Sequence, residues 1–73
     1  MSSNNVLYLI EQEDSKFKAY DWDADSDVWP SVQYEPNFEA LTLRDAIQRA
    51  GEYLSRNIVE YGYQVVLREG SGR

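Results

Sequence analysis

The sequence predicts one small α+β domain, in which a single helix packs on one face of an antiparallel-rich sheet of three or four strands. Three observations lead to this fold class: two β-favouring segments close together near the start, one long segment with helical spacing, and a short apolar segment after it. The expected order is strand, strand, optional strand, helix, strand. Seventy-three residues suffice for one domain only, and we expect residues 1–5 and 70–73 to be flexible.

The first two strands are expected at residues 6–10 and 16–22, which are rich in apolar, aromatic and β-branched side chains. Residues 14–15, Asp-Ser, suit a two-residue turn between them. Such a turn sets a register in which Glu11 lies opposite Lys18, a favourable cross-strand pair. Both faces of this hairpin are apolar. One helix can cover only one of them, so the other face, or the aromatic loop around Trp29 and Tyr34, is expected to need a partner.

The stretch that follows the hairpin, residues 24–40, is the least regular part of the chain. Residues 28–35 form either a short third strand or a loop, because Pro30 and Pro36 confine any strand there to a sheet edge. After the helix, residues 63–69 are expected to form the last strand, since Tyr-Gln-Val-Val-Leu is apolar and β-favouring.

The clearest element is a helix over residues 42–62. Thr42 can cap its start, with Asp45 three residues on. Apolar residues at helical spacing form one stripe: Leu43, Ala46, Ile47, Ala50, Leu54, Ile58 and Tyr61. Gly62 is expected to end the helix. Gly51 lies on the stripe and is expected to let the backbone approach the sheet closely.

The composition argues against catalysis, because the chain has no cysteine and no histidine. Zinc sites, nucleophilic triads and most acid–base pairs depend on these residue types. We therefore expect no enzyme activity, no cofactor and no metal. A small domain without disulfides is typical of a reducing compartment. The polar start and the lack of an apolar run of about 18 residues favour a cytoplasmic protein.

The net charge of −6 is unevenly distributed. Residues 11–39 hold nine acids against two lysines, whereas residues 40–73 hold four acids against five arginines. An acidic surface repels nucleic acids and membranes, so neither is expected to bind directly. A basic protein surface is the expected partner.

Four aspartates, Asp21, Asp23, Asp25 and Asp27, occupy every second position where the second predicted strand ends. An EF-hand calcium loop needs Gly at its sixth position and Glu at its twelfth. A loop that starts at Asp21 has Ser26 and Val32 there, so a calcium site is not expected. If the stretch stays extended, the four carboxylates line one face at a spacing of about 6.6–7 Å. Such a row would suit a basic partner or imitate a phosphate backbone.

The same stretch has a simpler interpretation, a solvated acidic loop that blocks edge-to-edge pairing of sheets. Trp29 and Tyr34 favour recognition instead, since binding hot spots are enriched in Trp and Tyr. The candidate partner-binding residues are Asp21, Asp23, Asp25, Asp27, Trp29, Tyr34 and Glu35. The favoured function is a non-catalytic, regulatory or inhibitory protein-binding module. The alternatives are a mimic that occupies a nucleic-acid site of a partner, and a self-associating module, for example a homodimer, without a dedicated ligand.

The stretches YLIEQEDSKFKAYDWD and LTLRDAIQRAGEYL resemble the front of HicB-type antitoxin domains. Those domains also run from a hairpin through a short strand to a helix that starts with T-L-x-x-A, and end with a closing strand. Here the Asp run and two prolines replace the Gly-containing segment expected before the helix. The layout is also similar to that of small phage proteins that inhibit host enzymes by binding them. Both resemblances imply a binder of a basic partner and no catalytic residue.

Overall fold

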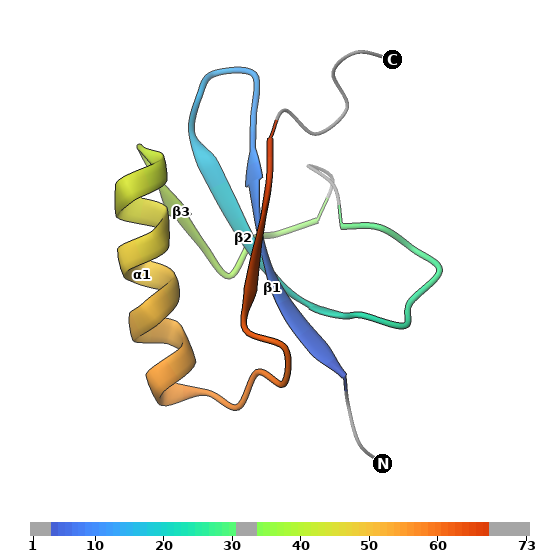
Figure 1. Ribbon diagram of the computed structural model, residues 1–73. Coiled ribbons are helices and arrows are strands. Elements are labelled where there is room, and N and C mark those ends of the chain that lie inside the picture. The colour runs from blue at the N-terminus through green and yellow to red at the C-terminus, as the bar shows by residue number, and fades with distance from the viewer. Residues whose placement is uncertain (1–3, 31–33, 68–73) are drawn as a thin grey trace.

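The computed structural model describes residues 4–30 and 34–67 (Figure 1). Its elements are β1 (Asn5–Glu11), β2 (Phe17–Asp23), β3 (Phe38–Ala40), α1 (Leu43–Arg56) and β4 (Tyr63–Val66). The strands form one sheet in the order β3-β2-β1-β4, in which β4 runs parallel to β1 and the other two pairings are antiparallel. The predicted α+β fold with a mostly antiparallel sheet is confirmed.

Of the ends predicted to be flexible, residues 1–3 and 70–73 lie outside the described residues. Asn5, also predicted to be flexible, is the first residue of β1. The last strand is confirmed at Tyr63–Val66, and residues 68–69 of the predicted segment are also outside the described range. Within that range no helix is both long enough and apolar enough to span a bilayer.

The β1–β2 hairpin has a three-residue loop, and the predicted two-residue turn is wrong. The Gln12 N–H donates to the Lys16 carbonyl (2.8 Å), which closes the loop one residue earlier than expected. Ser15 has φ 71°, the left-handed conformation that completes a three-residue hairpin loop. Glu11 consequently lies opposite Phe17, and its predicted position opposite Lys18 is wrong. A shift of one residue moves side chains to the opposite face of the sheet.

The register sorts the apolar side chains into two layers. The layer beneath α1 comprises Leu7, Leu9, Phe17, Ala19, Ala40, Ala46 and Ala50. The layer on the other face comprises Val6, Tyr8, Ile10 and Tyr20. All of these side chains are buried. The prediction that both faces of the hairpin are apolar is therefore confirmed, and each face has a cover of its own.

The third strand begins after both prolines. The predicted strand at residues 28–35 is not found: residues 28–30 and 34–35 are irregular, and residues 31–33 lie outside the described part of the chain. The Asn37 N–H donates to the Ala19 carbonyl (2.7 Å), and Phe38 then pairs opposite Ala19. Proline has no N–H to donate to a neighbouring strand, so pairing with β2 starts only beyond Pro36.

The start of α1 agrees with the prediction. The Thr42 hydroxyl oxygen accepts a hydrogen bond from the Asp45 N–H (3.1 Å), as an N-cap does. Asp45 also forms an ion pair with Arg49 one turn later (3.2 Å).

The end of α1 comes six residues earlier than predicted, at Arg56. Asn57 is extended (φ −126°), its N–H donates to the Tyr53 carbonyl (2.9 Å), and its side-chain amide donates to the same oxygen (3.1 Å). An asparagine side chain that bonds the last carbonyls competes with further helical turns. Gly62, with φ 76°, instead forms the turn before β4.

The buried face of α1 is narrower than the predicted stripe. Ala46 and Ala50 are fully buried, whereas Leu43 and Ile47 are 40% and 38% exposed. The predicted role of Gly51 is wrong: the residue is exposed, and a Cβ placed on it meets nothing within 4 Å. The helix approaches the sheet through its alanines instead.

Replacing Gly51 by alanine is expected to raise the free energy of unfolding by about 0.5–1 kcal/mol, since the space is open and alanine favours a helix. Urea denaturation measures the change. Gly62→Ala is the matched control and should destabilise, because its φ of 76° disfavours a side chain. A Gly51→Ala protein no more stable than the wild type would contradict the open environment of this residue.

Candidate functional site

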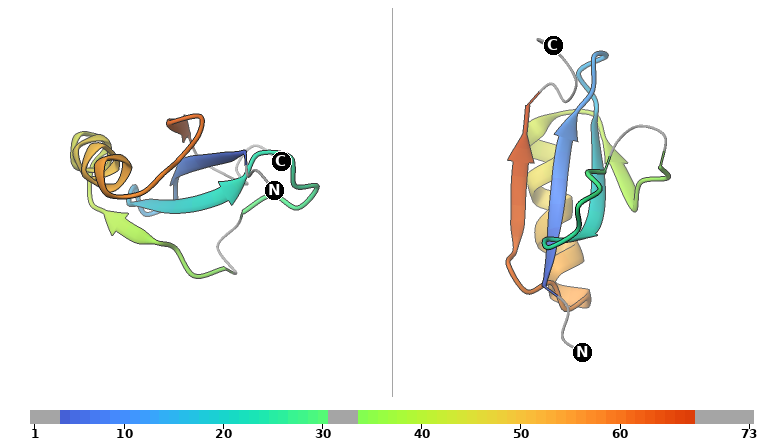
Figure 2. Two further views of the ribbon diagram at one scale, coloured as in Figure 1. Left: turned by 90° about the horizontal axis from the view of Figure 1, so that it is seen from below. Right: turned by 90° about the vertical axis from the view of Figure 1, so that its right-hand side faces the viewer.

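The acidic loop, defined here as residues 24–30 and 34–35, lies on the sheet face opposite α1 (Figure 2). The Trp29 ring packs on Tyr8 with 4.8 Å between centroids, and the Tyr34 ring packs on Trp22 at 5.1 Å. Pro30 is fully buried. The loop thus covers the second apolar layer, so this face of the sheet needs no other cover. That the aromatic loop itself needs a partner stays a prediction.

A tight turn brings the loop back over the sheet. The Asp23 carboxylate accepts a hydrogen bond from the Asp25 N–H (2.9 Å), and the Asp23 carbonyl accepts one from the Ser26 N–H (3.1 Å). Aspartate favours such turns because its side chain bonds the backbone two residues on. The stretch is therefore not extended beyond Asp23, and the predicted row of four evenly spaced carboxylates is wrong.

Three further hydrogen bonds hold the turn in place. The Trp22 indole N–H donates to the Val28 carbonyl (2.6 Å). The Ala24 N–H donates to the Asn4 carbonyl (2.6 Å), and the Asn4 amide donates to an Asp25 carboxylate oxygen (2.7 Å). The loop is thus tied to β2 and to the residue that precedes β1, which gives it a defined conformation.

The Asp21 carboxylate accepts hydrogen bonds from side chains of α1 and β1. One carboxylate oxygen accepts a hydrogen bond from the Tyr53 hydroxyl (2.9 Å), and the other accepts one from the Asn5 amide (2.9 Å). Its backbone N–H donates to the Asn37 side-chain oxygen (2.9 Å). Asp21 therefore joins β2 to β1, to α1 and to the segment before β3. This structural role differs from the predicted one in partner binding.

The environment of Tyr53 supports this role of Asp21. Burial raises the pKa of the Tyr53 hydroxyl above its usual value of 10.0, and the hydrogen bond to Asp21 and the negative charge of that carboxylate raise it further. The hydroxyl consequently keeps its proton at neutral pH and remains a donor to Asp21.

The remaining predicted site residues lie in the acidic loop, except Asp23, which ends β2. Asp23, Asp25, Asp27 and Glu35 are exposed, and Trp29 is 46% exposed beside Val28, which is 52% exposed. Tyr34 is half-buried, and its carbonyl accepts a hydrogen bond from the Tyr20 hydroxyl (3.3 Å). Tyr34 thus holds the loop to the sheet, while Trp29 and the acids are displayed outward.

No three His, Cys, Asp or Glu side chains of residues 4–30 and 34–67 are grouped so that they could hold a metal ion. The exposed aspartates of the loop therefore lie near one another along the chain without forming a common set of ligands.

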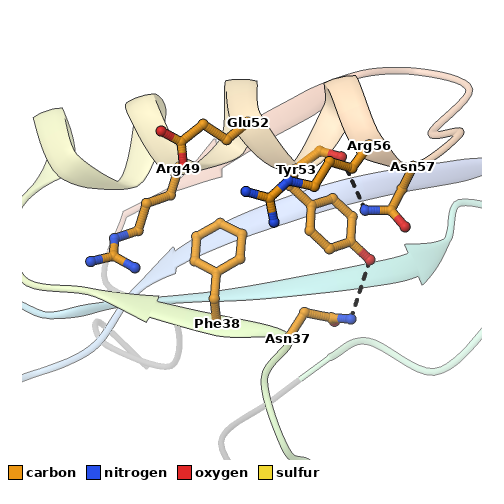
Figure 3. A pocket seen from close by; sticks show the side chains of 7 residues that line it. All are labelled: Asn37, Phe38, Arg49, Glu52, Tyr53, Arg56 and Asn57. Carbon is orange, nitrogen blue, oxygen red and sulfur yellow. Dashed lines mark hydrogen bonds between the residues drawn. The ribbon is translucent and has the colours of Figure 1, made fainter.

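A recess of about 320 Å³ lies between α1 and the segment that enters β3 (Figure 3). It is lined by Asn37, Phe38, Arg49, Glu52, Tyr53, Arg56 and Asn57. Its polar groups are largely engaged: Arg49 is paired with Asp45, and the Tyr53 hydroxyl donates to Asp21 and accepts from the Asn37 amide (3.3 Å). Charges of both signs line it, so it favours neither anions nor cations.

Sequence reasoning missed the roles of Tyr8 and Trp22, which anchor the loop, and of Tyr53, which anchors Asp21. A signal for the first two was present, since a hairpin with two apolar faces and one helix requires a second cover. Nothing local in the sequence marks the contact between Tyr53 and Asp21, because the two are 32 residues apart.

Comparisons with protein-family models, with curated proteins and with solved structures found no match to this chain. The resemblance to HicB-type antitoxin domains therefore rests on the order of the elements and on the helix start alone.

Proposed function

We propose that this chain is a non-catalytic protein-binding module, regulatory or inhibitory, that docks its acidic loop on a basic protein surface. The observation that carries the proposal is the presentation of Trp29. Its ring packs on Tyr8, and nearly half of its surface remains open beside exposed carboxylates. We place its action in a reducing compartment such as the cytoplasm, because the domain has no cysteine.

In the proposed docking, charge affects the association rate and apolar contact affects the dissociation rate. Exposed carboxylates steer a basic partner toward the loop, which raises the association rate and makes it sensitive to salt. A large aromatic side chain that becomes buried on binding slows dissociation. The loop is already tied down by hydrogen bonds from Trp22, Ala24 and Asn4, so little ordering cost remains for binding.

Mimicry of a nucleic acid has less support than docking on a protein. Such mimicry depends on carboxylates at regular spacing along an extended chain, and the turn at Asp23–Asp25 interrupts this spacing. Asp21 is also occupied by Tyr53 and Asn5. The apolar surface of Val28 and Trp29 has no counterpart in a phosphate backbone, and it favours a protein surface with an apolar recess.

The test is a variant with Asp23→Asn, Asp25→Asn and Asp27→Asn, in which Asp21 is left intact to preserve the fold. Binding of a fluorescent oligolysine peptide, followed by anisotropy, is expected to weaken about 5- to 10-fold at about 10 mM salt. The difference should shrink at about 0.5 M salt, where charges are screened within a few ångström. The wild-type chain is also used to capture a partner, which mass spectrometry identifies. The affinity of this partner for both chains is then measured by anisotropy at the same two salt concentrations.

The matched control carries Glu39→Gln, Glu52→Gln and Glu60→Gln, which change the net charge equally and lie outside the loop. This control should bind more tightly than the loop variant at low salt. Equal loss in both variants would show that only total charge matters and would refute docking through the loop.

A further inference from the structure

The two edges of the sheet differ in how they are protected (Figure 2). β3 is three residues long, carries Glu39 and follows Pro36, and short, charged strands near proline resist pairing with other chains. β4, at the other edge, has the sequence Tyr-Gln-Val-Val and carries neither a charge nor a proline. The β4 edge thus lacks the features that prevent strand addition.

β4 is an edge strand, and no other strand of residues 4–30 and 34–67 pairs with its outer side. The Leu7 N–H donates to the Gly62 carbonyl (3.0 Å), which fixes the phase of the parallel β1–β4 pairing. By the alternation of a parallel ladder, the N–H and C=O groups of Gln64 and Val66 point to β1. The N–H and C=O groups of Tyr63 and Val65 point outward, in the plane of the sheet, at its open edge.

Exposed apolar side chains occur in α1, in β4 and in the connection between them. Arg49 lies on the flank of α1 that faces β3, at the recess of Figure 3. Because successive residues of a helix are rotated by about 100°, Leu43 and Ile47 lie on the opposite flank of α1. Both are more than one-third exposed, and so is Tyr63 of β4 (40%). Ile58, in the connection between α1 and β4, is 95% exposed. Of these side chains, Tyr63 lies on the edge strand itself, whereas Leu43 and Ile47 belong to a helix that packs on β2 and β3.

Charge decides which chain can occupy the edge. Residues 41–67, which include α1 and β4, hold three acids and three arginines and are therefore neutral. The described residues before them, 4–30 and 34–40, hold nine acids and two lysines. Because β4 itself has no charged residue, a second copy meets no like charge at the paired strands. A strongly charged partner finds no complementary charge on this side.

We infer that two copies of this chain pair through their β4 strands, antiparallel and around a two-fold axis, so that two four-stranded sheets become one continuous sheet. A copy of the same edge supplies the matching uncharged strand. With the axis at Gln64 or at Val65, the outward N–H of Val65 lies within the paired segment. The side chains of Tyr63 and Val65 then extend the apolar layer from one copy to the other.

The pairing has a consequence for the acidic loops. A two-fold axis perpendicular to the sheet keeps each face on its own side, so both loops lie on one face of the dimer and both copies of α1 on the other. The dimer does not depend on the proposed function of the loop. If that function holds, a partner with two basic sites meets two loops at once and gains avidity.

The experiment is analytical ultracentrifugation of the full chain over about 1 µM to 1 mM. The wild type is expected to reach twice the 8.5 kDa mass of one chain. Val65→Pro removes the outward N–H and leaves the groups that face β1, so it should give a monomer with the wild-type circular dichroism spectrum. Should this variant unfold, Tyr63→Lys, which places a charge on the same edge, decides the question instead.

Leu41→Lys is the matched control, because Leu41 is 69% exposed and lies beside β3 rather than β4. It should remain dimeric. A wild type that stays monomeric at the highest concentration overturns the inference. A folded Val65→Pro or Tyr63→Lys protein that still dimerises also overturns it. The same holds for a Leu41→Lys protein that dissociates as fully as the β4 variants.

Discussion

Replacing Tyr20 by alanine is expected to lower the free energy of unfolding by about 3–5 kcal/mol, which is most of the stability of a domain of this size. Tyr20 is 1% exposed and lies opposite Tyr8 in the β1–β2 pairing. Its ring meets Trp22 edge to face (6.3 Å between centroids, 89°), and its hydroxyl donates to the Tyr34 carbonyl. One side chain thus joins the sheet to the loop that covers it.

Urea denaturation followed by tryptophan fluorescence measures this change, because Trp22 lies directly against Tyr20. Tyr20→Phe is the matched control. It keeps the ring and removes the hydroxyl, so it should cost about 1 kcal/mol. If Tyr20→Ala were no more destabilising than Tyr20→Phe, the second apolar layer would contribute little to the fold, and the loop could not be a structural cover.

Replacing Trp29 by alanine is expected to weaken binding of the basic partner by about 30-fold or more, the effect of losing a hot spot worth about 2 kcal/mol. The cost in stability should be smaller, about 1 kcal/mol, since Trp29 is 46% exposed and its ring contact with Tyr8 is one aromatic pair. Titration calorimetry with the captured partner measures the affinity, and thermal unfolding measures the stability.

Two variants separate direct contact from loosening of the loop. Trp29→Phe keeps a ring on Tyr8 and loses part of the exposed surface, so its affinity should lie between those of the wild type and Trp29→Ala. Leu41→Ala removes an exposed apolar side chain elsewhere and should bind like the wild type. Unchanged affinity of Trp29→Ala would exclude Trp29 as the anchor of the proposed interface.

The hairpin illustrates how far local sequence signals reach. The two strands are recognisable because their residues favour extended backbone, and both faces read as apolar. Their register was not predictable from the charge pairs, because Ser15 adopts φ 71° and adds a residue to the loop. A non-glycine residue in the left-handed region leaves no clear mark in a sequence. One such residue reverses which side chains lie beneath the helix.

In the candidate site, too, some features were predictable from the sequence and others were not. Composition and spacing alone led to the choice of the acids and Trp29; Asp23, Asp25, Asp27, Glu35 and Trp29 are exposed, and their role in binding stays a prediction. The role of Asp21 was not recognisable, because its partners Tyr53 and Asn5 come from distant parts of the chain. The turn of the loop was not recognisable either, because it depends on hydrogen bonds to Asn4 and on the aromatic contacts of the second face.

Local patterns in the sequence predict the fold class, the two hairpin strands, the capped start of α1 at Thr42 and the acidity of the loop. These depend on interactions between residues close together in the chain and on composition. The tertiary structure alone decided the register, the early end of α1, the place of β3 and the use of the acidic loop as a cover. Each of these results from competition among distant partners for the same backbone groups and apolar surface, and only the assembled fold resolves that competition.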